Sequence, residues 1–204
     1  NEQGKRYDRF RERIIFPIIN PKGDIIGFGG RVITGGTPKY LNSPETPLFE
    51  KGKELYGLYH ARSAIKSDGM ALVVEGYMDV IMLAQQGVEC AVATLGTATT
   101  AQHIQTLMRY TDKLVFCFDG DKAGRKAAWR ALENALPMLK DDKKLEFVFL
   151  PDGEDPDSYA KEHGKAGFMH YLQEKSLPLS AFFIQELSRQ VDLSSQEGHA
   201  HLIH

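Results

Sequence analysis

The apolar positions of the first third of the chain follow a β-strand pattern. Residues 13–20 (RIIFPIIN) predict a strand that is broken by Pro17, and residues 25–33 (IIGFGGRVI) predict a second strand. The intervening PKGD is typical of a tight turn, with Gly23 at a conformationally permissive position. We therefore expect a β-hairpin in this part of the chain.

The segment after the hairpin has a different composition. Residues 34–49 are rich in Pro, Gly, Asn, Ser and Thr, and they predict a long irregular loop. Long ordered loops usually carry a function or link domains. Residues 53–66 then predict a helix in which Gly57 is a flaw.

From residue 70 onward, short apolar runs alternate with helical patterns. Continuous apolar runs of this length are typical of strands that are buried on both faces. The predicted strands are 70–74, 90–96, 113–118 and 144–150, and the predicted helices are 77–87, 99–111, 121–139, 157–175 and 177–190. This alternation predicts right-handed crossovers and an α/β fold with a mostly parallel sheet.

Charge divides the chain in a similar way. Residues 1–66 hold 12 Lys and Arg against 7 Asp and Glu, whereas the remainder holds 13 against 20. A basic front part and an acidic remainder suit a protein that binds a polyanion with one part and cations with the other, although a chance division of solvated surface is an equal alternative. We expect three subdomains: a basic β-rich one at 1–66, a metal-binding one at 67–175, and the start of a helical one at 176–204.

Several classes of protein are disfavoured by simple features. No run of about 18 apolar residues predicts a membrane span, and the first ten residues contain no apolar signal segment. The two cysteines, Cys90 and Cys117, lie in apolar stretches, so we expect buried reduced thiols in a cytoplasmic protein. Because the chain does not begin with Met, we also expect it to be a fragment of a longer protein.

Carboxylates follow three of the predicted strands. Glu75 follows the first, Asp119 and Asp121 follow the third, and a PDGEDPD segment with Asp155 and Asp157 follows the fourth. Parallel sheets bind ligands beyond the carboxyl ends of their strands, so these groups are expected at one edge of the sheet. One more carboxylate, four residues after the first, lies in the first turn of the next predicted helix: Asp79.

Carboxylates gathered in this way repel one another and cost stability unless a cation joins them. Hard oxygen ligands favour Mg²⁺ or Mn²⁺. In the Asp119–Asp121 pair, residues two apart in extended chain point the same way, and we expect Gly120 to permit a sharp turn between them. Helix capping is an equally good explanation for Asp79 or Asp121 taken alone.

The motifs resemble a known family. VVEGYMDVI and FCFDGDKAGRKAA resemble the toprim motif set, a metal-binding module of bacterial primases, type IA and type II topoisomerases, some nucleases and recombination mediators. GFGGR, PKYLNSPETPLFEKGKELYGL and LPDGEDPDSY further resemble the RNA-polymerase core of bacterial replicative DNA primases. The resemblance covers nearly the whole chain. It implies a toprim-type, mostly parallel sheet flanked by helices, with a small β-rich subdomain before it and a partial helical subdomain after it.

The resemblance also implies site residues. Matching positions for binding one to three Mg²⁺ or Mn²⁺ ions are Glu75, Asp79, Asp119, Asp121, Asp155 and Asp157. Of these we expect Glu75, Asp119 and Asp121 to be catalytic, with Glu75 acting either as a ligand or as a general base. Positions that match nucleotide-binding or nucleic-acid-binding residues are Arg31, Lys39, Tyr40, Asn42 and Lys51. Arg125 and Lys126, at the start of the helix predicted at 121–139, either pair with the carboxylates or reach a phosphate.

The implied activity is that of a nucleotidyltransferase that makes short RNA primers. Its partners would be a single-stranded DNA template, ribonucleoside triphosphates and the RNA primer, at the replication fork in the bacterial cytoplasm, with no membrane involved. The family's zinc-binding and helicase-interaction domains have no match in the sequence. We therefore expect no zinc in this chain, and contact with the replicative helicase only through another part of the full-length protein.

Two other functions remain open from the motifs. The first is a DNA-cleaving toprim enzyme, a topoisomerase or nuclease; a topoisomerase needs a nucleophilic tyrosine, and no tyrosine here lies in such a motif, although Tyr77 is not excluded. The second is a non-catalytic DNA-binding toprim module, against which the complete carboxylate set argues.

Overall fold

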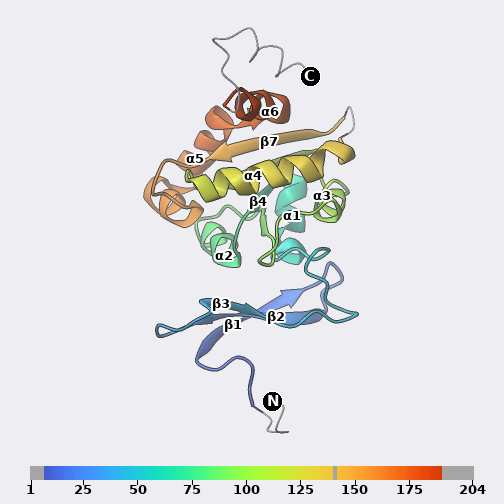
Figure 1. Ribbon diagram of the computed structural model, residues 1–204, viewed down its shortest axis with the longest axis vertical. Helices are drawn as coiled ribbons and strands as arrows, with labels where there is room; N and C mark the ends of the chain where they lie inside the picture. The colour runs from blue at the N-terminus through green and yellow to red at the C-terminus, as the bar shows by residue number, and fades with distance from the viewer. Residues whose placement is uncertain (1–6, 140–141, 190–204) are drawn as a thin grey trace.

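The computed structural model describes residues 7–139 and 142–189, which form a small antiparallel sheet and a larger α/β unit (Figure 1). The small sheet has the order β1-β2-β3, with β1 at Arg13–Ile19, β2 at Ile25–Val32 and β3 at Tyr40–Asn42. The predicted hairpin is confirmed. The predicted break at Pro17 is wrong, because Pro17 lies within β1 opposite Phe28. β1 is an edge strand, and such a strand tolerates proline because one of its sides makes no ladder hydrogen bonds.

The loop predicted at residues 34–49 contains the third strand of this sheet. Tyr40 of β3 pairs with Arg31 of β2, and the Val32 N–H donates to the Lys39 carbonyl over 3.1 Å. A strand of three residues has too short a pattern to be found among turn-forming residues. This strand places two residues that were predicted to bind nucleic acid, Arg31 and Tyr40, side by side.

The α/β unit has the strand order β5-β4-β6-β7-β8. Its strands are β4 Ala71–Val74, β5 Ala91–Ala93, β6 Lys113–Phe118, β7 Lys144–Phe149 and β8 Leu177–Pro178. Its helices are α1 Leu58–Asp68, α2 Tyr77–Gln85, α3 Ala101–Leu107, α4 Lys122–Ala135, the 3₁₀ turn η1 Leu136–Met138, α5 Pro156–Lys175 and α6 Leu179–Ser188. The first four strands are parallel and only β8 is antiparallel, so the prediction of a mostly parallel α/β sheet is confirmed.

The centre of this sheet is the core of the molecule. Every residue of β4 is buried, as are the last five residues of β6, and the ring of Phe116 stacks on that of Phe147 in the neighbouring strand. Strands buried on both faces require helices on both faces, which the crossovers supply (Figure 1). Cys90 and Cys117 are buried free thiols, as predicted. Within the described residues, none of the helices combines the length and the apolar character that crossing a membrane requires.

The helix predicted from residue 53 begins later, at Leu58. Gly57 is not a flaw in that helix but the residue before it, with a left-handed φ of 84°. The preceding Tyr56 is bridged to Ala93 of β5 by two backbone hydrogen bonds of 2.8 and 3.0 Å. A Cβ at Gly57 would lie 2.8 Å from Cγ1 of Val80, so close packing as well as the left-handed angle requires glycine here.

The C-terminal helices also differ from the prediction. Leu177 and Pro178 extend the sheet as β8 before α6 begins, whereas the sequence predicted a helix from residue 177. Gly164, with φ 67°, interrupts α5. The division into subdomains at 1–66, 67–175 and 176–204 stays a prediction. Residues 1–6 and 190–204 lie outside the described part of the chain.

A second, smaller apolar cluster joins the small sheet to the α/β unit. It consists of the buried residues Ile18, Phe49, Tyr77 and Leu95. A hydrogen bond of 2.9 Å from Nδ2 of Asn42 to the carbonyl of Leu95 crosses the same junction. The small sheet is therefore packed against the α/β unit at the start of α2.

Candidate metal and nucleic-acid site

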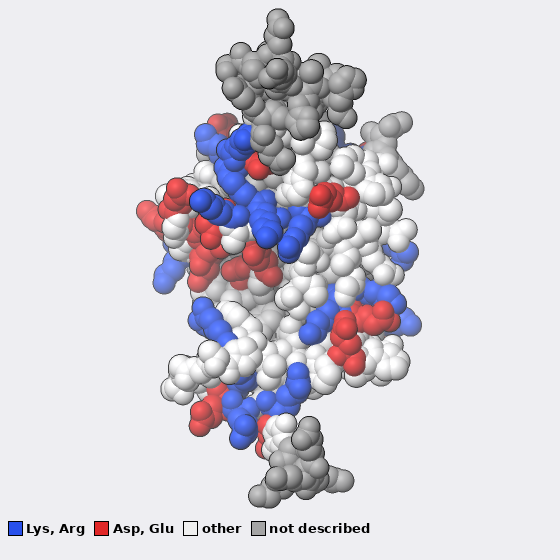
Figure 2. All heavy atoms as spheres, in the orientation of Figure 1, with Lys and Arg blue, Asp and Glu red and all other residues white. Residues whose placement is uncertain are grey.

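The carboxyl ends of three adjacent parallel strands carry the predicted acidic residues. Glu75 follows β4, Asp119 follows β6, and the Asp155–Asp157 segment begins α5 shortly after β7. Figure 2 shows acidic side chains gathered beside the hollow between the α/β unit and the small sheet, with basic side chains above and below them. The sheet topology therefore brings the predicted carboxylates to one edge.

Glu75 is the most perturbed of these groups. Its side chain reaches solvent, but partial burial of the carboxyl group is the largest cause that raises its pKa to about 7. Repulsion from Asp119, then from Asp79 and Asp121, raises the pKa further. Glu75 thus interacts with the acidic residues of a neighbouring strand end and of its own helix.

Asp79 connects two parts of this acidic edge. It is half-buried, and burial raises its pKa to about 6, against the lowering effect of a hydrogen bond of 2.9 Å from the Gly76 N–H. Asp155, Asp119 and Asp157 then raise the pKa in that order. The pKa of Asp119 is raised in turn by burial, by Asp155 and by Asp121. These mutual effects on pKa connect all six predicted carboxylates along one edge of the sheet.

Two of the aspartates also cap helices. Oδ1 of Asp121 accepts from the Gly124 N–H over 2.7 Å at the start of α4, and Oδ1 of Asp155 accepts from the Ser158 N–H over 2.7 Å at the start of α5. Capping and cation binding are therefore compatible, since a carboxylate has a second oxygen. Asp157 differs, because its Oδ1 is buried and has no hydrogen-bond partner among the described residues.

Gly120 has a different role from the one predicted. Gly120 does not adopt a left-handed conformation, so the turn between Asp119 and Asp121 does not depend on glycine's torsional freedom. A Cβ at this position would lie 2.3 Å from the Leu150 carbonyl oxygen. Glycine is required because the loops after β6 and β7 pass each other at backbone contact.

The carboxylates do not close around one point. Within residues 7–139 and 142–189, no three His, Cys, Asp or Glu side chains are grouped closely enough to hold a metal ion by themselves. Mg²⁺ is commonly held by one or two carboxylates together with waters and substrate phosphates. The donor set, with its mutual repulsion and the unpartnered oxygen of Asp157, fits such an open site better than an all-protein cage.

The basic residues form a second group on the small sheet. The Arg31 guanidinium lies 5.9 Å and the Lys39 Nζ 5.7 Å from the centre of the Tyr40 ring, which is 40% exposed. Asn42, on the same strand, is directed inward to Leu95. Three of the five predicted binding residues, Arg31, Tyr40 and Asn42, are thus on β2 and β3, and Lys39 directly precedes β3.

Lys51 is separate from this group. Its carbonyl accepts a hydrogen bond of 2.9 Å from Nε2 of His103, whose Nδ1 accepts from the Thr100 N–H. No hydrogen bond or aromatic contact within the described ranges joins Lys51 to Arg31, Lys39 or Tyr40. The structure therefore fixes the backbone of Lys51 but does not bring its side chain to the Tyr40 group.

The structure corrects the prediction for one basic residue, Arg125, and shows a contact of another, Arg13, that the sequence did not predict. Arg125 neither pairs with the carboxylate cluster nor projects freely. Its Nη1 lies 3.0 Å from Oε1 of Glu186, and its guanidinium lies 4.7 Å from the centre of the Phe149 ring. Arg13 holds the loop before β3, donating 2.8 Å to the Pro38 carbonyl and 3.3 Å to that of Lys39. Its sequence position, at the start of a strand, gave no signal of this contact with the loop.

Two known protein families match successive parts of the chain. A family described as the N-terminal domain of the DNA primase catalytic core matches residues 1–62, and a toprim-like family matches residues 72–160. A DNA primase of Neisseria meningitidis is 62% identical over 203 residues, and the Escherichia coli DNA primase is 57% identical over 202 residues. These matches cover 100% and 99% of the chain but 34% and 35% of the relatives, so the chain spans about a third of their length.

Solved structures agree with these matches. The E. coli primase catalytic core superposes with a TM-score of 0.94 at 56% identity, covering 99% of this chain and 64% of that one. A DNA primase domain from Pseudomonas aeruginosa gives 0.94 at 56% identity, with 98% and 63% coverage. A primase catalytic domain bound to single-stranded DNA gives 0.93 at 56% identity, with 99% and 65% coverage.

Proposed function

Because the chain belongs to the bacterial DNA primases and matches part of their catalytic core, we propose that it joins ribonucleotides into short RNA primers on a single-stranded DNA template. The observation that carries this proposal is the coupled carboxylate cluster at the ends of β4, β6 and β7, next to the cationic group around Tyr40. Acidic and cationic groups side by side suit a reaction between a metal-bound triphosphate and a nucleic-acid strand.

The reaction needs alignment and charge neutralisation more than covalent chemistry from the protein. The 3′ hydroxyl of the primer attacks the α-phosphorus of the incoming nucleoside triphosphate, and pyrophosphate leaves. Bound Mg²⁺ or Mn²⁺ would neutralise the triphosphate and lower the pKa of the attacking hydroxyl. We assign Glu75, Asp119 and Asp121 to the more tightly bound ion, and we assign three further carboxylates to positioning a second ion: Asp79, Asp155 and Asp157.

The state of Glu75 supports this assignment. With its pKa raised to about 7, this carboxyl group is about half protonated at neutral pH. A cation at the cluster would displace that proton, because metal ligands must be deprotonated. A carboxylate with a pKa near 7 is also suited to general-base catalysis, so the raised pKa is compatible with both roles of Glu75.

The cationic group would hold the nucleic acid. Arg31 and Lys39 would neutralise phosphates, which makes binding depend on salt. Tyr40 is exposed between them, so its ring would offer a surface on which a base stacks. The likeness to a primase catalytic domain bound to single-stranded DNA supports single-stranded DNA as the ligand of this chain.

The remaining partners are proposals for the whole protein. They are ribonucleoside triphosphates, the growing RNA primer and a replicative helicase. Their site of action would be the replication fork in the bacterial cytoplasm.

The proposal is tested by incubating the chain with a single-stranded template, labelled ribonucleoside triphosphates and Mg²⁺ or Mn²⁺. We expect template-dependent RNA oligomers from the wild-type chain and none from Asp119→Asn. Asp68→Asn is the matched control, since Asp68 is an exposed carboxylate at the end of α1, outside the cluster.

Three results would contradict the proposal. Absence of RNA from the wild-type chain would do so directly. Nicked or relaxed DNA without added nucleotides would indicate a strand-cleaving enzyme. Binding of DNA without any product would indicate a non-catalytic module.

A further inference from the structure

Tyr77 lies between the two halves of the proposed site. It is the first residue of α2, two positions after Glu75 and two before Asp79, and it is only 5% exposed. Its ring contacts three aromatic residues of other segments, Phe16 at 5.0 Å and Tyr40 and Tyr56 at 5.3 Å between ring centres. Tyr77 therefore joins the carboxylate turn directly to the strand that carries the exposed tyrosine.

The hydroxyl group of Tyr77 is not explained by this packing. Its oxygen is buried and has no hydrogen-bond partner in the described part of the chain. The same holds for Oδ1 of Asn42 on β3, whose amide orientation is fixed because Nδ2 donates to the Leu95 carbonyl. A donor on α2 and an acceptor on β3 are thus both buried and unpaired.

The Tyr77 ring and the Asn42 amide oxygen border the same small space beside Gly29. A Cβ built on Gly29, in β2, would lie 3.1 Å from Cζ of Tyr77 and 3.2 Å from Oδ1 of Asn42. A side chain at Gly29 would press on both groups. Cζ of Tyr77, which carries the hydroxyl, and Oδ1 of Asn42 thus both lie next to this one backbone position.

Buried unpaired polar groups are rare because they destabilise the folded state. Phenylalanine would pack the same ring in this aromatic cluster without that cost. The hydroxyl of Tyr77 therefore contributes nothing to the stability of the arrangement seen here.

We propose that Tyr77 is a positioning residue, whose hydroxyl donates to Oδ1 of Asn42 when template and nucleotide occupy the site. The bond fixes β3 against the first turn of α2. It thereby holds the Tyr40 surface at a set distance from Glu75 and Asp79, so that the strand and the bound nucleotide are aligned. The inference rests on the proposed primer synthesis and adds a residue to it.

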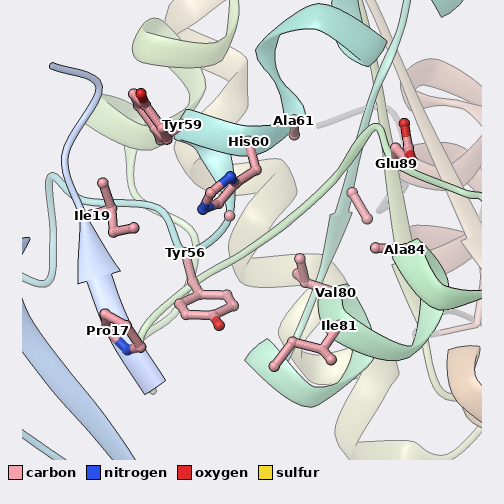
Figure 3. Close-up of a pocket in the computed structure, with 12 residues that line it drawn as sticks. Pro17, Ile19, Tyr56, Tyr59, His60, Ala61, Val80, Ile81, Ala84 and Glu89 are labelled. Atoms are coloured by element: carbon pink, nitrogen blue, oxygen red, sulfur yellow. The ribbon is translucent and has the colours of Figure 1, made fainter. Parts of the chain in front are cut away.

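Tyr56 supplies a matched control. Its ring packs on Tyr77 in the same cluster, but it lines a cavity of about 440 Å³ on the other side of the junction, between β1, α1 and α2. Figure 3 shows the Tyr56 ring at the wall of this cavity, with its hydroxyl on the side of Ile81. Tyr56→Phe therefore removes a hydroxyl oxygen from the same aromatic cluster, as Tyr77→Phe does, but leaves Asn42 unaffected.

The first experiment compares Tyr77→Phe and Tyr56→Phe by primer synthesis and by thermal unfolding of the free protein. We expect Tyr77→Phe to lower kcat by about three- to tenfold, the rate equivalent of one neutral hydrogen bond. KM for template and for nucleotide should rise by no more than a similar factor, because the phosphate-binding side chains are intact and only the bond formed in the filled site is lost. The free protein should be as stable as the wild type or slightly more stable, and Tyr56→Phe should keep its kcat.

The second experiment is a double-mutant cycle with Asn42→Ala. Loss of the bond to Leu95 affects both backgrounds equally, so it cancels in the cycle. We expect Tyr77 and Asn42 to be coupled in kcat. We expect no coupling between them in the stability of the free protein. An unchanged kcat in Tyr77→Phe would overturn the inference. A loss of stability in that free variant would overturn it as well, because the hydroxyl would then already be bonded, for example to a water.

A third measurement separates this inference from the proposed function. The stabilisation of the chain by template with Mn²⁺ and nucleotide is followed by thermal unfolding, which does not depend on RNA synthesis. A smaller stabilisation in Tyr77→Phe than in the wild type supports the inference even if the wild-type chain makes no RNA, in which case only the proposed function fails. Equal stabilisation of the two proteins contradicts the inference.

Discussion

Glu75→Gln should make the metal-free protein more stable above neutral pH while removing its activity. Burial and three neighbouring carboxylates raise the pKa of Glu75 from an ordinary value near 4.5 to about 7 in the folded state. The folded chain therefore holds this proton more tightly than the unfolded chain does. That advantage is present below about pH 4.5 and is lost as the pH rises through 7.

The size of the effect follows from the same pKa. At about 1.4 kcal/mol per pKa unit, ionising Glu75 in the folded protein costs at most about 3.4 kcal/mol. Because the side chain is exposed and screened by solvent, we expect about 1–2 kcal/mol. For a chain of this size that corresponds to a rise in Tm of about 2–8 °C in the glutamine variant at pH 8.

The assay is thermal or urea unfolding in EDTA between pH 5 and 8.5. At pH 5 the difference should be smaller, because Glu75 is then mostly protonated in the folded wild-type protein. Added Mg²⁺ should stabilise the wild type at pH 8 more than the variant. A variant that is no more stable than the wild type at pH 8, or whose advantage does not depend on pH, would refute the reasoning.

Three further predictions follow from contacts around the site. Gly120→Ala should lose about 2–3 kcal/mol of stability in urea unfolding and most primer synthesis, because its Cβ would lie 2.3 Å from the Leu150 carbonyl oxygen. Gly35→Ala is the control in the same unfolding assay, because a Cβ at Gly35 would have no atom within 4 Å. Arg31→Ala should reduce the slope of log K against log salt for single-stranded DNA by about 0.7, measured by fluorescence anisotropy, and an unchanged slope would remove Arg31 from the phosphate contacts. Arg125→Ala should cost about 1 kcal/mol in urea unfolding through the lost pair with Glu186, with primer synthesis per folded molecule unchanged. A large loss of synthesis in that folded variant would instead place Arg125 in the site.

The sheet and the acidic edge could be predicted because they depend on short-range patterns. Apolar runs such as residues 113–118 specify buried parallel strands, and in a parallel sheet the residue after each strand has to lie at one edge. The sequence therefore predicts that Glu75 and Asp119 lie at the same edge of the sheet. Their coupled pKa values are the result of that topology.

The errors share a different origin, since each depends on a contact between distant segments. β3 is only three residues long and exists because β2 lies beside it, and Gly57 is needed where the chain passes Val80. The role of Gly120 depends in the same way on Leu150, 30 residues further along the chain. Tyr77 gave no signal of its place between the two halves of the site, because nothing within its own helix indicates which residues of the small sheet it meets.

Two capping aspartates give the protein a built-in spectroscopic probe. The Gly124 amide of α4 is bonded to Asp121, and the Ser158 amide of α5 is bonded to Asp155. A cation that binds either carboxylate changes the charge on the oxygen atom that accepts the hydrogen bond from the amide. The NMR chemical shifts and hydrogen-exchange rates of these two amides would therefore follow occupancy of the β6 and β7 sides of the cluster separately. In a titration with Mg²⁺, they would report the order in which the two sides fill, without any label at the site itself.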